Sequence, residues 1–219
     1  MSRFTVVGLG PGDPELVTMK GYKTLKDADI IFYPKTSLNS AENILLALGI
    51  DRKKLRAMEF PIGSEKLKEL CAGYGNTITE AYYSNVKSVY AVEGEPMLYS
   101  TFLDIIPFLD IEYTIIPGIS SMNGISAAMK IILATKDEPL QIIPAINDYR
   151  YMENRIMSMQ NTVIFKAIRA KDIIKDIIIK QGIKDYFIMS YVSTDQERIY
   201  NNIEDIRDYM TIVVIKRYT

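Results

Sequence analysis

The stretch Phe4-Thr5-Val6-Val7-Gly8-Leu9-Gly10-Pro11-Gly12-Asp13 leads a short apolar strand directly into a glycine-dense turn that carries a carboxylate. Glycine lets the backbone approach a ligand without a Cβ in the way, and proline stiffens the turn. In open α/β sheets, small molecules bind beyond the carboxyl ends of the strands. The stretch therefore predicts an α/β protein with a ligand site directly after its first strand.

A dinucleotide-binding turn is the familiar interpretation of such a stretch, and it fits this chain poorly. That fingerprint needs Gly-x-Gly-x-x-Gly followed by a helix, and a second strand that ends in Asp or Glu. Here the glycines give Gly-x-Gly-x-Gly, Asp13 and Pro14 follow, and the second apolar run ends in Tyr33-Pro34-Lys35. A carboxylate at this place would repel a pyrophosphate. A turn without a ligand stays open as the alternative.

The composition limits the chemistry that this chain can perform. Histidine is absent and Cys71 is the single cysteine, which excludes Ser-His-Asp and Cys-His nucleophile systems, a His-Glu-x-x-His zinc site and an intrachain disulfide. We expect no bound metal. Catalysis must then depend on carboxylates, lysines, tyrosines, hydroxyls, backbone groups or a reactive cofactor.

Charge and hydropathy point to a cytoplasmic protein. The net charge of −1 gives no bulk attraction to nucleic acid or to an anionic membrane. No segment approaches the ~20 apolar residues of a membrane helix. The first residues enter a strand at once and leave no room for a signal peptide. We therefore expect a cytoplasmic enzyme with no nucleic-acid or membrane partner.

Apolar runs suited to buried strands alternate with helix-length segments, which predicts α/β architecture. The expected strands are residues 4–8, 30–33, 55–60, 86–92, 113–116, 141–143, 161–167, 187–192 and 211–216. The expected helices are residues 18–26, 41–48, 65–83, 101–108, 120–129, 149–159, 170–181 and 203–208. We expect two α/β domains, residues 1–116 and 117–219, with a cofactor cleft between them, because ligand sites favour such interfaces.

Two further segments resemble ligand loops. Glu93-Gly94-Glu95-Pro96 follows an apolar run, and Pro117-Gly118-Ile119-Ser120-Ser121 opens a helix rich in small residues. An acidic backbone cradle suits a cationic ligand better than a phosphate. The alternatives are a capped strand–turn–helix for the first segment and tight packing of a helix on a sheet for the second.

Taken together, these motifs resemble the tetrapyrrole (corrin/porphyrin) methyltransferases. The matching segments are Gly8–Asp13 with Thr18, Gly94–Pro96 with Tyr99–Thr101, Pro117–Ser121, Thr162–Lys166, Tyr191–Ile199 and Tyr209–Arg217. Within the family, the resemblance extends to the cobalamin-pathway branch that methylates C20 of precorrin-2 or cobalt-factor II. This narrower resemblance rests on three segments, Leu98–Phe102, Phe32–Lys35 and Leu133–Ala145. Glu95 stands where Asp is commonest in the family.

The resemblance implies the cofactor S-adenosylmethionine, with S-adenosylhomocysteine as product, and a set of residues that contact it. Many of these contacts are expected through backbone atoms. The implied residues are Leu9, Gly94, Glu95, Leu98, Ser120, Ser121, Phe165, Lys166, Val192 and Ile212.

It also implies a tetrapyrrole substrate with many carboxylates, and a homodimer. Lys35 and Tyr99 are our candidates for contacts with this substrate, and Arg169 is a further one. The alternatives are solvated surface charges and a core aromatic. Asp13 is our candidate catalytic residue, which orients the substrate or accepts a proton; alternatively, it caps residues 15–20.

Other functions stay open from the sequence. A family member could methylate a different ring position. Diphthine synthase shares the implied fold but methylates a protein side chain. A non-catalytic nucleotide-binding module could use the same turns without chemistry.

Overall fold

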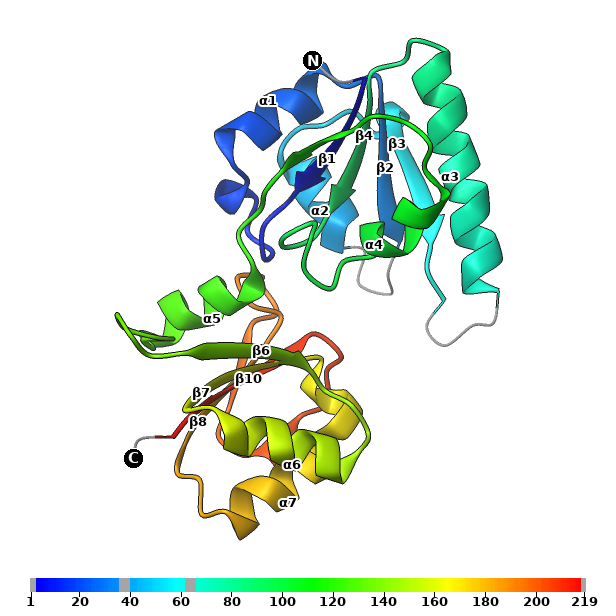
Figure 1. Ribbon diagram of the computed structural model, residues 1–219. Helices are drawn as coiled ribbons and strands as arrows, with labels where there is room; N and C mark the ends of the chain where they lie inside the picture. The colour runs from blue at the N-terminus through cyan, green and yellow to red at the C-terminus, as the bar shows by residue number, and fades with distance from the viewer. Residues whose placement is uncertain (1–2, 36–39, 62–65, 218–219) are drawn as a thin grey trace. The chain divides into compact units, whose positions relative to one another are not determined.

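The computed structural model describes residues 3–35, 40–61 and 66–217, and the chain divides into two compact units, residues 1–120 and 121–219 (Figure 1). The boundary lies after Ser120, whereas the sequence placed it after Ile116. The reason is that Gly118 lies in backbone contact with Gly8 and Gly94, which ties the segment after Ile116 to the first unit. The predicted α/β fold is confirmed, with a parallel sheet in the first unit and a mixed sheet in the second.

The sheet of the first unit is parallel throughout its five described strands. Their order is β3-β2-β4-β1-β5, and their bounds are β1 Phe4–Gly8, β2 Ile30–Lys35, β3 Leu55–Glu59, β4 Ser88–Val92 and β5 Thr114–Ile116. Because strands that run in the same direction end at the same edge, the loops after β1, β4 and β5 gather there.

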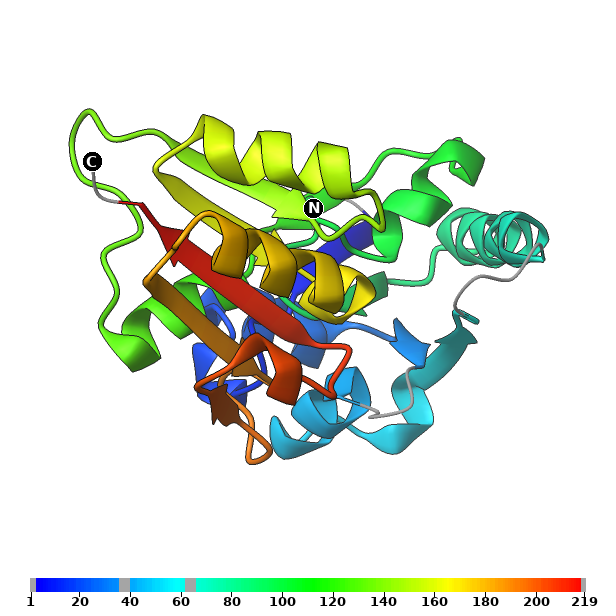
Figure 2. The same cartoon turned by 90° about the horizontal axis from the view of Figure 1, so that it is seen from below.

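Helices cover both faces of this sheet (Figures 1 and 2). Apolar residues that alternate along the strands pack beneath them, as expected for parallel strands covered on both sides. Val7 and Val89 lie on the face covered by α1 (Met19–Asp27) and α2 (Ser40–Ala47). The other face is covered by α3 (Leu67–Tyr83) and α4 (Phe102–Ile105), which pack on Phe4, Val6, Phe32, Tyr90 and Val92.

The second unit has a mixed sheet. Its strand order is β6-β7-β10-β8-β9. β6 is parallel to β7, and the other neighbouring pairs are antiparallel. The bounds are β6 Leu140–Pro144, β7 Asn161–Phe165, β8 Asp185–Ser190, β9 Arg198–Tyr200 and β10 Thr211–Lys216. α6 (Tyr149–Ser158) and α7 (Lys171–Lys180) pack on the face that carries Ile164 and Val213, while α5 (Ser121–Met129) packs on the opposite face.

Several elements differ from those that the sequence predicts. The expected strands 161–167 and 187–192 end earlier, at Phe165 in β7 and at Ser190 in β8, so Lys166 and Val192 lie beyond the strand ends. The expected helix 203–208 is a single 3-10 turn, Ile203–Asp205. The expected helix 101–108 is interrupted: α4 ends at Ile105 and a 3-10 turn continues over Ile106–Phe108, because Pro107 has no backbone N–H to donate. The edge strand β9 was not expected at all. Residue 65, expected in a helix, lies outside the described residues.

Across the described ranges, no helix combines the length and the apolar character needed to cross a bilayer.

Candidate active site

The glycine-dense turn after β1 is hydrogen-bonded to the loop after β4. The Leu9 N–H donates to the Val92 carbonyl at 2.8 Å, and the Gly94 N–H donates to the Gly10 carbonyl at 2.8 Å. Gly10 and Gly94 form an antiparallel β-bridge beyond the ends of the parallel strands β1 and β4. The first two loops singled out by the sequence therefore lie side by side.

The third loop joins them through close contacts between glycines. A Cβ on Gly8 would lie 2.5 Å from the Gly118 nitrogen and 2.6 Å from the Gly94 carbonyl oxygen. A Cβ on Gly118 would lie 2.1 Å from the same Gly94 oxygen. No side chain fits at either position, so glycine is required for these three loops to meet.

Glu95 fixes this arrangement with both oxygens of its carboxylate. Oε1 accepts a hydrogen bond from the Met97 N–H at 3.1 Å, within the loop after β4. Oε2 accepts one from the Gly118 N–H at 3.0 Å, in the loop after β5. The side chain therefore has an observed structural role. Its expected contact with the cofactor stays a prediction.

The candidate catalytic and substrate residues lie at the same edge of the parallel sheet. Asp13 follows β1, Lys35 ends β2 and Tyr99 follows β4. Oδ1 of Asp13 accepts a hydrogen bond from the Glu15 N–H at 2.8 Å and so caps the 3-10 turn Pro14–Leu16, which is the structural role that the sequence left open. Tyr99 has φ +53° and is exposed, so it is not the core aromatic that the sequence left as its alternative.

Lys35 forms a weak surface pair. Its Nζ lies 3.4 Å from Oε1 of Glu59, at the ends of neighbouring strands β2 and β3. About half of the Lys35 side chain, 51%, is exposed, so its ammonium group is accessible to an acidic ligand.

Leu9 differs from the other expected cofactor residues of the first unit. Its side chain is 0% exposed and packs in the core between the sheet and helices α1 and α2. A side-chain contact between Leu9 and a ligand is therefore ruled out. Its backbone remains as the means of contact that the resemblance implied.

Glu93 is a further acid at this edge, in addition to the expected site residues. Its Oε1 atom is buried and has no hydrogen-bond partner among the residues that the structure describes. Burial raises the pKa of the Glu93 carboxyl, and hydrogen bonds from the Ser40 hydroxyl and the Ala41 backbone at the start of α2 oppose this effect. The signal in the sequence was an acid placed directly after a wholly buried strand, β4.

In the second unit, the structure brings three of the expected cofactor residues into one cluster. Phe165 on β7 faces Ile212 on β10 in the antiparallel register, and Val192 joins the same apolar cluster. Val192 and Ile212 are each 3% exposed. Lys166 follows with φ +56°, a left-handed conformation that non-glycine residues seldom adopt.

The remaining expected residues lie in loops or at helix starts. Leu98 donates its N–H to the Glu95 carbonyl at 3.1 Å. Ser120 is buried at the end of the first unit, and Ser121 is the first residue of α5. Arg169 lies in the 3-10 turn Ala167–Ala170. Within the described part of the chain, no group of three or more Asp, Glu or Cys side chains is placed to hold a metal ion.

The first unit has a parallel sheet with three glycine loops at one edge, and the second unit has a mixed sheet, so the chain is a two-unit α/β protein. The family model of the tetrapyrrole (corrin/porphyrin) methylases matches residues 3–207, and the chain belongs to that family. Methylases of this family use S-adenosylmethionine. The family and cofactor implied by the sequence motifs are thereby confirmed.

Individual relatives and solved structures agree with this assignment. A probable cobalt-precorrin-2 C(20)-methyltransferase of Methanocaldococcus jannaschii is 28% identical over 225 residues, 97% of this chain and 95% of the relative. The X-ray structure of a cobalt precorrin-4 methyltransferase has a TM-score of 0.77 at 18% identity, covering 97% and 94% of the two chains. A uroporphyrin-III C-methyltransferase of Thermus thermophilus, complexed with S-adenosylhomocysteine, has a TM-score of 0.70 at 18% identity, covering 97% and 96%.

The loops of the first unit fit the charge of this cofactor. Asp13, Glu93 and Glu95 place three carboxylates on loops whose glycine backbones can approach a ligand closely. A sulfonium cation is favoured in such surroundings and a phosphate is not. At Gly94, which has φ +68°, an added Cβ would meet no described atom within 4 Å, so the space beside this backbone is open.

Proposed function

We propose that this chain methylates C20 of precorrin-2 or cobalt-factor II in cobalamin biosynthesis. The observation that carries the proposal is the similarity to the C(20)-methyltransferase relative, which runs along nearly the whole of both chains. The segments Leu98–Phe102 and Phe32–Lys35 support it, because both lie at the loop-bearing edge of the parallel sheet.

The candidate residues divide between binding the cofactor and binding the substrate. S-adenosylmethionine would be held by the backbones of the loops after β1 and β4, by Ser120 and Ser121, and in the second unit by Phe165, Lys166, Val192 and Ile212. The cofactor supplies a methyl group on a sulfonium centre, and its leaving group is a neutral thioether. A neutral leaving group needs no protonation, which is compatible with a chain that has no histidine.

The protein then has two tasks: it aligns the methyl donor with the acceptor, and it recognises the substrate. Rigid loops that hold the donor and acceptor in line can supply several kcal/mol of the rate enhancement, on the order of 7–11 in well-oriented systems. Lys35 would pair with a substrate carboxylate, and Tyr99 would contact the macrocycle. Asp13 would orient the substrate or accept the proton that leaves C20. We also propose that the enzyme acts as a cytoplasmic homodimer.

Incubation of the purified protein with methyl-labelled S-adenosylmethionine and each candidate acceptor tests the proposal. Precorrin-2 or its cobalt form should gain one methyl group, which NMR should place at C20. Label in cobalt-precorrin-4 but in neither proposed acceptor would reassign the ring position. Label in elongation factor 2 alone would indicate a diphthine synthase. Binding of NAD(H) without S-adenosylmethionine would indicate a nucleotide-binding module.

A further inference from the structure

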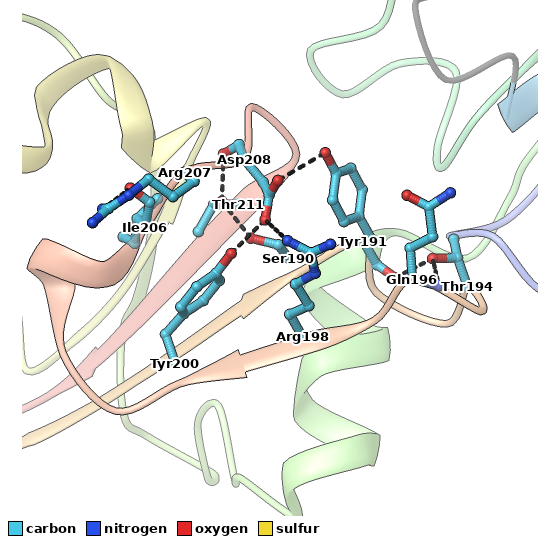
Figure 3. Close-up of polar contacts among 10 residues, drawn as sticks. All are labelled: Ser190, Tyr191, Thr194, Gln196, Arg198, Tyr200, Ile206, Arg207, Asp208 and Thr211. Carbon is cyan, nitrogen blue, oxygen red and sulfur yellow. Dashed lines mark hydrogen bonds and ion pairs between the residues drawn. The ribbon is translucent and has the colours of Figure 1, made fainter.

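In the second unit, polar side chains converge on Asp208, which precedes β10 (Figure 3). The Tyr191 hydroxyl donates a hydrogen bond to Oδ1 at 3.0 Å, and the Tyr200 hydroxyl donates one to Oδ2. The Arg198 guanidinium lies 3.6 Å from Oδ2. Only 12% of the Asp208 side chain is exposed, so the protein itself supplies the partners of this carboxylate.

The backbone of Asp208 is also fixed. The Thr211 hydroxyl donates to the Asp208 carbonyl at 2.5 Å and is hydrogen-bonded to the Ser190 hydroxyl at 2.5 Å. Both hydroxyl residues are fully buried, at the end of β8 and the start of β10. Hydroxyl groups on two neighbouring strands, β8 and β10, therefore hold the Asp208 backbone in place.

The loop of residues 191–193, which the Tyr191 hydroxyl joins to Asp208, has an unusual backbone. Tyr191 and Ser193 have φ angles of +51° and +60°, a left-handed region that non-glycine residues seldom adopt. Val192, between them, keeps its side chain in the apolar cluster of the second unit. Strained backbone of this kind persists only where the surroundings impose it, and it gathers at ligand sites.

Hydrogen bonds fix the loop on both sides of Val192. The Tyr191 N–H donates to the Met210 carbonyl at 3.2 Å, and the Thr194 hydroxyl donates to the Tyr191 carbonyl at 2.7 Å. The Ser193 N–H donates to Oε2 of Glu197 at 2.7 Å. The Tyr191 side chain adds the bond to Asp208, which ties this loop to β10.

We propose that Asp208 is a positioning residue that acts through the Tyr191 hydroxyl to hold residues 191–193 in the conformation that presents the Val192 backbone to S-adenosylmethionine. This inference rests on the cofactor contact proposed for Val192. Burial and the hydrogen bond to Asp208 raise the pKa of Tyr191, and the same two causes raise the pKa of Tyr200. Both phenols therefore stay protonated and donate to the carboxylate at neutral pH.

The two tyrosines provide a matched pair of variants. Tyr191→Phe and Tyr200→Phe each remove a hydroxyl bonded to the same carboxylate, but Tyr191 belongs to the 191–193 loop and Tyr200 belongs to β9. Calorimetric titration should give a Kd for S-adenosylhomocysteine raised about tenfold in Tyr191→Phe, equivalent to about 1.4 kcal/mol, and changed less than about twofold in Tyr200→Phe. The melting temperatures of the two variants should fall by similar amounts.

The outcomes separate this inference from the proposed function. An unchanged Kd in Tyr191→Phe, with normal binding by the unaltered protein, would overturn the positioning role alone. Equal weakening in the two variants would also overturn it, because general loosening of the Asp208 cluster would then explain the effect. Failure of the unaltered protein to bind S-adenosylhomocysteine would overturn both the proposed function and the positioning role.

Discussion

Oε2 of Glu95 accepts a hydrogen bond from the Gly118 N–H at 3.0 Å and so joins the loop after β4 to the loop after β5. The other oxygen of this carboxylate accepts from the Met97 N–H at 3.1 Å. Hydrogen bonds within the protein therefore fix two loops of the candidate active site to each other. Preorganisation of this kind lowers the cost of binding, because fewer groups have to be ordered when the ligand arrives.

Glu95→Gln should weaken this connection. An amide presents an acceptor oxygen on one side and N–H donors on the other, so it cannot accept from Met97 and Gly118 at once. We expect the free energy of unfolding to fall by about 1–2 kcal/mol, as measured by urea denaturation, and the Kd for S-adenosylhomocysteine to rise.

Glu59→Gln is the matched control for this change. Glu59 ends β3 at the same sheet edge, and its side chain is 72% exposed in a pair with Lys35. Exposed pairs contribute about 0–1 kcal/mol, so this variant should unfold almost as the unaltered protein does. Equal losses in the two variants would show that the bonds of Glu95 contribute nothing beyond an exposed charge.

Gly118→Ala tests the backbone contacts between the three glycine loops. The new Cβ would lie 2.1 Å from the Gly94 carbonyl oxygen, so the loops would have to separate. We expect thermal and urea denaturation to show a loss of about 1–3 kcal/mol, together with weaker cofactor binding. Gly182→Ala is the comparison, since φ is +60° but no described atom lies within 4 Å of its Cβ. It should cost about 1–2 kcal/mol from conformation alone and leave cofactor binding unchanged.

The parts of the fold that follow from local sequence were predictable. β1 and β10 have the predicted bounds, because each is a continuous apolar run of the kind that a doubly covered strand requires. The short strand β9 was missed because Arg198, Ile199 and Tyr200 show neither alternation nor burial and pair only with the edge of β8.

The site was predictable where it depends on backbone and not where it depends on distant partners. Glycines at positions 8, 94 and 118 signalled close approach, and the structure shows that approach. The bond between Glu95 and Gly118 spans 23 residues, and no local pattern reveals it. For the same reason, the cluster around Asp208 could not be foreseen, because its members come from two loops and three strands.

Substitution by alanine at two glycines of α3 should change the stability of the protein in opposite directions. A Cβ on Gly75 would lie 2.6 Å from the Phe108 carbonyl oxygen, whereas one on the exposed Gly73 would meet no described atom within 4 Å. Gly73→Ala should stabilise the protein by about 0.5–1 kcal/mol, because alanine favours a helix interior more than glycine does. Gly75→Ala should destabilise it by about 1–3 kcal/mol. Urea denaturation of both variants checks the prediction, and a gain in stability for Gly75→Ala would contradict the packing of α3 on Phe108.

Glu93 should make stability depend on pH in a direction opposite to that of an ordinary carboxylate. Burial raises the pKa of Glu93 above its usual value of 4.5, despite hydrogen bonds from Ser40 and Ala41. Between the unfolded and the folded pKa, the folded protein therefore binds more protons than the unfolded chain. Stability then falls as the pH rises through that interval.

Glu93→Gln removes this titration while it keeps an oxygen that can accept from the Ala41 N–H. The difference in unfolding free energy between Glu93→Gln and the unaltered protein should therefore shift in favour of the variant as the pH rises from about 4. The shift should end once the pH has passed the raised pKa of the folded state. Urea denaturation of both proteins at a series of pH values measures the difference. Parallel pH profiles would mean that the Glu93 carboxyl has the same pKa in the folded and unfolded chains, and that its burial carries no electrostatic cost.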